Sequence, residues 1–262
     1  MDGSGNVVVT GISFNSSTNH GCYTAKYAAA DGALLWEKLY NDRANTSASA
    51  LAVDGSGNVV VTGGSGWATG RDYYTAKYAA ADGALLWEKL YNGTANGYDQ
   101  ASAVAVDGSG NVVVTGSSAS GGDSLGNSIF DYYTAKYASA DGALIWEKRL
   151  TSASKPDFEL NSPHRLALGS NGMVAVTGTS YGGYATFVYR EVPEVVSINL
   201  VSAGIRLRFS GVSGRGYNIE RAPAVSGPWS TINTQTASAS GLFEYLDTNS
   251  PPAAAFYRTS EP

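Results

Sequence analysis

Short apolar runs and glycine-rich polar turns alternate along the first 190 residues of the chain. The runs Val7–Thr10, Val59–Thr62 and Val112–Thr115 each begin with three successive valines, whereas a strand with one solvent-exposed face would alternate apolar and polar positions. Each run follows the turn Asp-Gly-Ser-Gly-Asn, in which glycine allows the positive φ that a tight hairpin needs. The pattern therefore predicts antiparallel strands that are covered on both faces.

A second segment alternates with these valine runs. Tyr-Thr-Ala-Lys-Tyr begins at Tyr23, Tyr74 and Tyr133, and each copy is followed by Asp-Gly and then by a tryptophan. The spacing is 52 residues from Asp2 to Asp54 and 53 residues from Asp54 to Asp107. This is the length of one four-stranded blade of a β-propeller. We therefore expect an all-β protein built from about four propeller blades, in a partial or small propeller.

The register of the last hairpin in each repeat follows if Asp-Gly is a two-residue turn. Cross-strand pairs are then expected at Tyr27–Trp36, Lys26–Glu37, Tyr78–Trp87, Lys77–Glu88, Tyr137–Trp146 and Lys136–Glu147. We also expect the three tryptophans to occupy equivalent environments against the adjoining blade.

The repeats divide the first 192 residues into a partial first blade (1–49), two blades (50–100 and 101–162) and a last blade (163–192). The first unit lacks its opening strand, so we expect upstream blades or association to cover that sheet edge. In the last blade, the fourth strand is either absent or supplied by Val195–Asn199. Short strands with Gly, Ser and Pro turns predict a small β-sandwich over 193–262, with Trp229 in its core.

These segments resemble known families. The Gly-Asn turn, Val-Val-Val-Thr-Gly and Tyr-Thr-Ala-Lys-Tyr together resemble the SBBP-type bacterial β-propeller repeat over about residues 1–190. Ala30–Trp36 resembles the tryptophan-docking segment of quinoprotein propellers, in which Gly and Trp lock adjacent blades. Tyr217–Arg221, Gly227–Trp229 and Phe256–Arg258 resemble a fibronectin type III-like or Ig-like module. The resemblances imply a bacterial, extracytoplasmic protein, and only the quinoprotein family implies a redox cofactor.

Composition narrows the classes of partner. Only 15% of residues are charged and the net charge is -5, which argues against nucleic acid and against anionic membrane surfaces. No apolar run is long enough for membrane insertion, and Cys22 is the single cysteine. We expect a secreted or cell-surface protein, with no signal peptide in this chain, no metal site and no cofactor. The Asp-Gly-Ser-Gly-Asn turn lacks the bidentate carboxylate of a calcium loop, so we interpret it as a hairpin turn.

The candidate binding residues lie on the long loops, which differ between repeats and gather at one end of the blades. Aromatic rings among carboxylates and amides suit a glycan or a protein ligand. The candidates are Trp67, Arg71, Asp72, Tyr98, Asp99, Phe130, Asp131, Tyr181 and Tyr184.

No nucleophile, histidine pair or selected carboxylate pair identifies a catalytic residue. The favoured hypothesis is therefore a non-catalytic binding or scaffold protein that carries carbohydrate or protein on this loop face. The alternatives are a propeller enzyme, either glycan-cleaving or quinoprotein-like, whose site lies partly in missing upstream blades, and a structural spacer.

Overall fold

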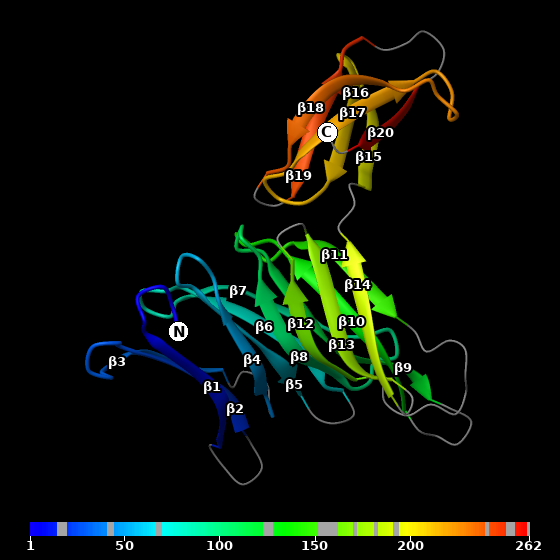
Figure 1. The fold of residues 1–262 in the computed structure, drawn as a ribbon. Coiled ribbons are helices and arrows are strands. Elements are labelled where there is room, and N and C mark those ends of the chain that lie inside the picture. The colour runs from blue at the N-terminus through cyan, green and yellow to red at the C-terminus, as the bar shows by residue number, and fades with distance from the viewer. Residues whose placement is uncertain are drawn as a thin grey trace. The chain divides into compact units, whose positions relative to one another are not determined.

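The computed structural model describes residues 1–14, 20–40, 45–66, 70–122, 128–150, 162–169, 172–180, 183–190, 194–238, 241–249 and 255–260. Every regular element among them is a β-strand (Figure 1). The chain forms two compact units, one of Met1–Ser170 with Val174–Tyr189 and one of Arg190–Pro262 with Asn171–Met173. The predicted all-β fold with propeller-like blades is confirmed.

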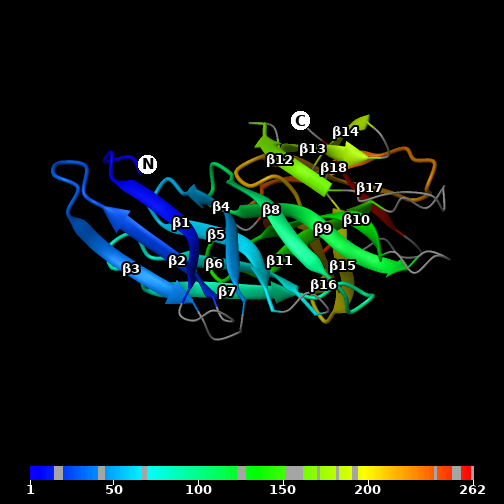
Figure 2. The ribbon, with the colours of Figure 1, turned by 90° about the horizontal axis from the view of Figure 1, so that it is seen from below.

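The first unit consists of four antiparallel sheets, which we call the first to fourth blades. The first blade contains β1 (Val7–Phe14), β2 (His20–Tyr27) and β3 (Leu34–Tyr40), and the fourth contains β12 (Ser162–Leu168), β13 (Met173–Ser180) and β14 (Gly183–Arg190). The second blade contains β4 (Ser47–Val53), β5 (Val59–Ser65), β6 (Asp72–Tyr78) and β7 (Leu85–Tyr91). The third blade contains β8 (Asp99–Val106), β9 (Val112–Gly122), β10 (Ser128–Tyr137) and β11 (Leu144–Leu150). Within each blade, consecutive strands are neighbours. Figure 2 shows the blades following one another in chain order.

The core of this unit lies between blades, because each blade is apolar on both faces. Val60 of the second blade packs toward the third blade in one cluster, whereas its neighbours Val59 and Val61 pack toward the first blade in another. Val113 likewise packs toward the fourth blade, in a cluster with Val174 and Val176. All three valines of β5 and of β9 are buried, which confirms two covered faces for these strands. In β1 only Val8 is buried, so the prediction is wrong for the outward face of that strand.

The tryptophans lie in equivalent places. Trp36 contacts Tyr78 of the next blade with ring centroids 6.5 Å apart, Trp87 contacts Tyr137 at 6.3 Å and Trp146 contacts Tyr189 at 6.3 Å. The predicted equivalence of the three tryptophans is confirmed for this contact, although Trp146 is half-buried and the other two are buried.

The predicted hairpin register is wrong, by one residue at the lysine and by two at the tyrosine. Lys26 lies opposite Trp36, and a bulge then sets Tyr27 opposite Leu34. The same pairs recur as Lys77–Trp87 and Tyr78–Leu85, and as Lys136–Trp146 and Tyr137–Leu144, in place of the predicted Tyr78–Trp87, Lys77–Glu88, Tyr137–Trp146 and Lys136–Glu147.

A longer turn causes this shift. The hairpin closes between Ala28 and Ala33, and the Asp31 carboxylate accepts a hydrogen bond from the Ala33 N–H at 2.9 Å. Residues 29–32 lie between this closing pair, so the turn holds four residues rather than two, and Gly32 has a φ of 72°. Lys26 and Trp36 therefore lie side by side on adjacent strands, which lets both reach one acceptor of the next blade.

The second unit is a small β-sandwich, as predicted by the fold class. Its sheets are β15 (Glu194–Val201), β16 (Gly204–Ser210) and β19 (Leu242–Asp247), and β18 (Ser230–Thr236), β17 (Gly216–Ala222) and β20 (Phe256–Ser260). β15 pairs with β16, so Val195–Asn199 does not supply a fourth strand to the last blade. We expected Trp229 in the core of this unit, but it is not part of the core cluster. It is half-buried, and the Arg258 guanidinium lies 4.3 Å from its ring centroid.

Candidate functional site

The two ends of the blades differ in the length of their connections. At one end the turns Asp54–Asn58 and Ala79–Ala84 are short, and the side chain of Asn58 accepts a hydrogen bond from the Ala80 N–H at 3.0 Å. At the other end the longer connections meet, and the Asp99 N–H donates to the Arg71 carbonyl at 2.7 Å. We call these the turn end and the loop end.

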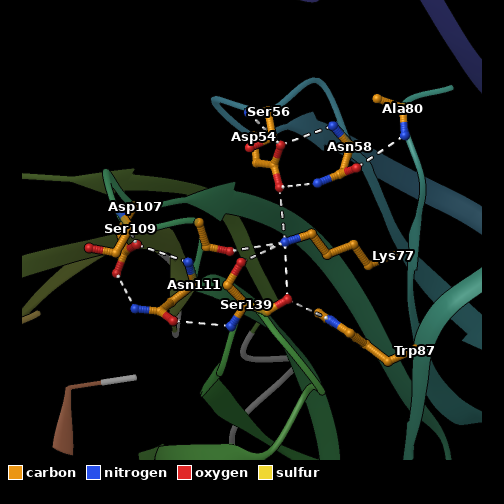
Figure 3. Close-up of polar contacts among 11 residues, drawn as sticks. Asp54, Ser56, Asn58, Lys77, Ala80, Trp87, Asp107, Ser109, Asn111 and Ser139 are labelled. Atoms are coloured by element: carbon orange, nitrogen blue, oxygen red, sulfur yellow. Dashed lines mark hydrogen bonds and ion pairs between the residues drawn. The ribbon is translucent and has the colours of Figure 1, made fainter. Parts of the chain in front are cut away.

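At the turn end, the Asp-Gly-Ser-Gly-Asn turn of the repeat holds a buried ion pair. The Asp54 carboxylate accepts hydrogen bonds from the backbone N–H groups of Ser56 and Asn58, each at 2.9 Å. Its other oxygen lies 2.9 Å from Nζ of Lys77, and both side chains are almost completely buried (Figure 3). Burial opposes the Asp54 charge, but hydrogen bonds from Asn58 and Lys77 outweigh it and lower the pKa of this carboxyl. The hairpin interpretation of the turn is confirmed.

The same ion pair joins two blades. Lys77 Nζ of the second blade also donates to the Ser139 carbonyl at 3.2 Å and to the Ser139 hydroxyl at 2.8 Å in the third blade. Trp87 Nε1 donates to that same carbonyl at 3.1 Å (Figure 3). The ammonium group is thus surrounded by acceptors, which offsets its removal from water.

The joint between the first and second blades is built in the same way. Lys26 pairs with Asp2 at 2.8 Å and donates to the Ala80 carbonyl at 3.0 Å, which also accepts from Trp36 Nε1 at 3.2 Å. Ala80 has no hydroxyl where the next blade has Ser139. A pocket of about 310 Å³ lies here, lined by Asp2, Asn6, Lys26 and the Gly55–Gly57 turn among others.

At the loop end, three of the predicted residues form one aromatic and basic cluster. The Arg71 guanidinium carbon lies 5.7 Å from the ring centroid of Tyr98, and the Tyr98 ring meets Phe130 edge to face at 6.1 Å. All three side chains are half-buried. We call Arg71, Tyr98 and Phe130 the loop-end cluster. It joins the residue before β6, the connection from β7 to β8 and the start of β10.

Arg71 is held by neutral groups. One terminal nitrogen donates to the Ser47 hydroxyl and to the Gly64 carbonyl at 3.3 Å. Its buried Nε has no hydrogen-bond partner among the described residues. The cluster presents two rings and a cation, a set that suits a ligand with apolar faces and oxygen acceptors.

The predicted carboxylates Asp99 and Asp131 lie beneath the surface. Asp99 is fully buried and accepts from the Gly93 N–H at 2.7 Å and the Ala119 N–H at 3.1 Å, which ties two loop-end connections together. Desolvation raises the pKa of Asp99, and these hydrogen bonds counteract it only in part. Asp131 pairs with Arg149 at 2.9 Å, and its second oxygen is buried with no hydrogen-bond partner among the described residues.

Arg149 connects this layer to the neighbouring blade. It donates to the Tyr91 hydroxyl at 2.6 Å and to the Ser118 hydroxyl at 2.8 Å. The Tyr91 ring stacks on Tyr133 with centroids 3.7 Å apart. Asp99 and Asp131 therefore hold backbone and Arg149 in place next to the loop-end cluster, and neither carboxylate is exposed.

The other candidates do not join the cluster in the described residues. Asp72 is buried at the start of β6 and has an interaction partner, while Tyr184 is 89% exposed on β14 of the fourth blade. Trp67 and Tyr181 lie outside the described residues.

Sequence reasoning missed three groups at these ends: the buried lysines, Arg149 and Gln100. The lysines recur with an aspartate in each of the first three repeats, and this pairing was the available signal. Gln100 donates to the Ser49 hydroxyl at 2.6 Å beside Tyr98. No regular pattern marks Gln100 or Arg149, because each occurs in one repeat only.

Within the described ranges, no group of three or more His, Cys, Asp or Glu side chains is arranged to hold a metal ion. The same part of the chain contains no helix that is long and apolar enough to cross a membrane. Cys22 is buried, as a small structural residue would be, and burial raises the pKa of its thiol.

Comparison with known proteins leaves the family open. No protein-family model matches the chain. No curated protein matches it. Among solved structures, the crystal structure of BamB from Moraxella catarrhalis is similar, with a TM-score of 0.34 and 13% sequence identity over 89% of this chain and 65% of the BamB chain. This chain thus spans less than two thirds of that chain's length. The fold described above rests on the strand pairing and the contacts between blades in this chain.

Proposed function

We propose that this chain is a non-catalytic binding or scaffold protein whose loop end binds a glycan, through the rings of Tyr98 and Phe130 and the guanidinium of Arg71. The observation that carries the proposal is the loop-end cluster itself, in which a cation lies over one ring and that ring meets a second. Aromatic rings stack on the apolar faces of sugars, and guanidinium groups donate to their oxygens.

The layer beneath the cluster supports this role. Asp99 fixes the backbone of Gly93 and Ala119, and Arg149 joins Asp131, Ser118 and Tyr91. A binding residue is effective when neighbouring groups hold it in one position, because less conformational entropy is then lost on binding. The blades provide such a base.

The same layer favours binding over catalysis. A glycan-cleaving site needs two carboxyl groups that reach the substrate, whereas Asp99 and Asp131 are both buried and hold loop backbone or Arg149. A propeller enzyme, with a site partly in further blades, and a structural spacer are the alternative functions. We place the protein outside the cytoplasm, on the surface or secreted, because Ser, Thr, Asn and Gly rather than charges supply its polar surface.

Binding is tested with the full chain on a glycan array and in pull-downs with insoluble polysaccharides, followed by calorimetry on the best ligand. Tyr98→Leu and Phe130→Leu keep apolar volume but remove the ring, and each is expected to weaken binding about tenfold, the usual loss for an energetically important interface residue. Leu86→Ser is the matched control, because Leu86 is exposed on the outermost strand of the second blade.

Equal affinity of the two ring variants and the parent chain would show that the glycan binds elsewhere. Absence of binding to every glycan, together with release of reducing sugars from a polysaccharide, would favour the enzyme. Absence of both would favour a protein ligand or a spacer.

A further inference from the structure

We propose that the face of the first blade turned away from the second blade is a docking surface for a further blade of the same repeat type, which lies outside residues 1–262 and presents a Lys–Trp pair. This inference does not depend on the glycan proposal. It follows from comparing the first two joints of the chain with the outward face of the first blade.

Each of the first two joints has a donor half and a receiving half. The donor half is the neighbouring Lys and Trp of one blade, and the receiving half is a carbonyl and a glycine in the last turn of the following blade. Trp36 lies so close to Gly83 that a Cβ there would come within 2.7 Å of its ring, and Trp87 lies 2.8 Å from the corresponding Cβ position at Gly142. The carbonyls are those of Ala80 and Ser139.

The first blade carries the receiving half without a donor. Gly32 has the same positive φ as Gly83, 72° against 67°, but nothing lies within 4 Å of its Cβ position. Ala29, which corresponds to Ala80 and Ser139, is exposed, whereas those two residues are half-buried.

The valines of the first blade give the same result. Val7 and Val9 are 42% and 41% exposed, whereas Val59 and Val61, their counterparts in the second blade, are fully buried against the first blade. Val8, on the opposite face of β1, is buried against the second blade. The exposed valines therefore belong to a face that is shaped to be covered.

A second copy of residues 1–262 does not offer the required donor half. Lys26 and Trp36 are engaged at Ala80, and Lys77 and Trp87 are engaged at Ser139. Trp146 contacts Tyr189, and the sequence of the fourth blade contains no tryptophan. The occupant that fits is a blade with its own unengaged Lys–Trp pair.

The experiment supplies that blade. A copy of residues 54–106 is joined directly to Asp2 in place of Met1, which continues the repeat spacing and sets a copy of β8 beside β1. Val9→Cys is introduced in the parent chain and in the extended chain, and thiol labelling is followed by mass spectrometry. The native Cys22 is buried, so labelling reports position 9.

We expect labelling of Val9→Cys to slow at least about 100-fold in the extended chain, because a buried thiol reacts only when the structure opens locally. Leu39→Cys is the matched control. Its counterpart Leu90 is still 38% exposed although the second blade is covered, so labelling at position 39 should not change. Replacing the copied tryptophan by alanine should restore much of the labelling at position 9.

Equally fast labelling of Val9→Cys in both chains would overturn the proposal, including when the added blade fails to fold, because a receiving face should order it. Protection in the parent chain that increases with protein concentration would identify a second copy as the occupant instead. A loss of glycan binding would leave this result untouched, since the two surfaces use different residues.

Discussion

Lys77 shows how a charged side chain is accommodated in the interior of this protein. Its ammonium group lies 2.9 Å from the Asp54 carboxylate and donates to both oxygens of Ser139 and, at 3.4 Å, to the Gly110 carbonyl. A buried ion pair contributes little net stability by itself, but removal of one partner leaves an uncompensated charge. The intact Asp54–Lys77 pair therefore adds little to the free energy of unfolding, whereas loss of Lys77 alone should lower it strongly.

Replacement of Lys77 by methionine tests this account. We expect Lys77→Met to destabilise the first unit by about 3–5 kcal/mol, because the Asp54 carboxylate stays buried without its cation. Urea unfolding measures the change. The double variant Asp54→Asn with Lys77→Met removes both charges and should be less destabilised than Lys77→Met alone; a larger loss in the double variant would contradict the ion-pair explanation.

Local chemistry of single residues could be predicted only where it depends on sequence neighbours. The Asp54 turn was predictable because its carboxylate binds backbone two and four residues away. The partner of Lys77 was not, because it depends on which face of β6 the side chain occupies. A one-residue change of register reverses that face.

At the scale of elements, the glycine of the last turn in the second and third blades has a left-handed backbone and also leaves space for the tryptophan of the preceding blade. Gly32 and Gly83 share a left-handed backbone, but only Gly83 lies against a tryptophan. The cost of adding a Cβ therefore separates into backbone strain, common to both, and contact with the indole, present in one.

We expect Gly83→Ala to destabilise the first unit more than Gly32→Ala does. Both variants carry about 1–2 kcal/mol of backbone strain, and Gly83→Ala adds about 1–3 kcal/mol for crowding a packed joint. Denaturant unfolding of both variants measures the difference. Equal losses would show that Trp36 moves aside without cost and does not lock the joint.

Strand existence was predictable from the repeat, whereas strand pairing in detail was not. Three successive valines indicated two covered faces, and the structure buries all three in β5. The register failed because Asp-Gly was taken as a two-residue turn, although it forms the end of a four-residue turn capped by Asp31. The sequence Ala-Ala-Ala-Asp-Gly has no feature that fixes the length of the turn.

At the scale of the whole molecule, the two units have separate hydrophobic clusters and separate buried carboxylates. Asp247 of the sandwich accepts from Arg221 and from the Tyr257 hydroxyl, both at 2.8 Å. Burial opposes its charge, but the hydrogen bonds from Tyr257 and Arg221 outweigh burial and lower the pKa of Asp247.

A lowered pKa in the folded state means that this carboxylate stabilises the sandwich above the unfolded pKa of about 4. The contribution is lost as the pH falls through the lower, folded value. We expect Asp247→Asn to destabilise the second unit at pH 7 and to flatten its loss of stability below pH 4. Hydrogen exchange with mass spectrometry measures each unit, and an equal effect on the first unit would contradict their independence.

The loop end shows where sequence reasoning reaches its limit. Length and variability of the connections pointed to this end, and the structure brings Arg71, Tyr98 and Phe130 together there. Asp99 and Asp131 were predicted as binding residues for the same reason, but both are buried. Burial of a loop carboxylate depends on long-range packing against Arg149 and Ser118, which no local pattern encodes.

Every complete blade carries both sides of its own joints, and this bears on how such a gene changes. Duplication of one unit yields a copy that already matches the neighbours before and after it, so no compensating substitution is required. Loss of one unit likewise leaves compatible flanks. Unequal recombination can therefore lengthen or shorten the array by whole blades while every remaining junction is preserved. Natural variants should differ by the length of whole repeats, which is 52 residues from Asp2 to Asp54 and 53 residues from Asp54 to Asp107.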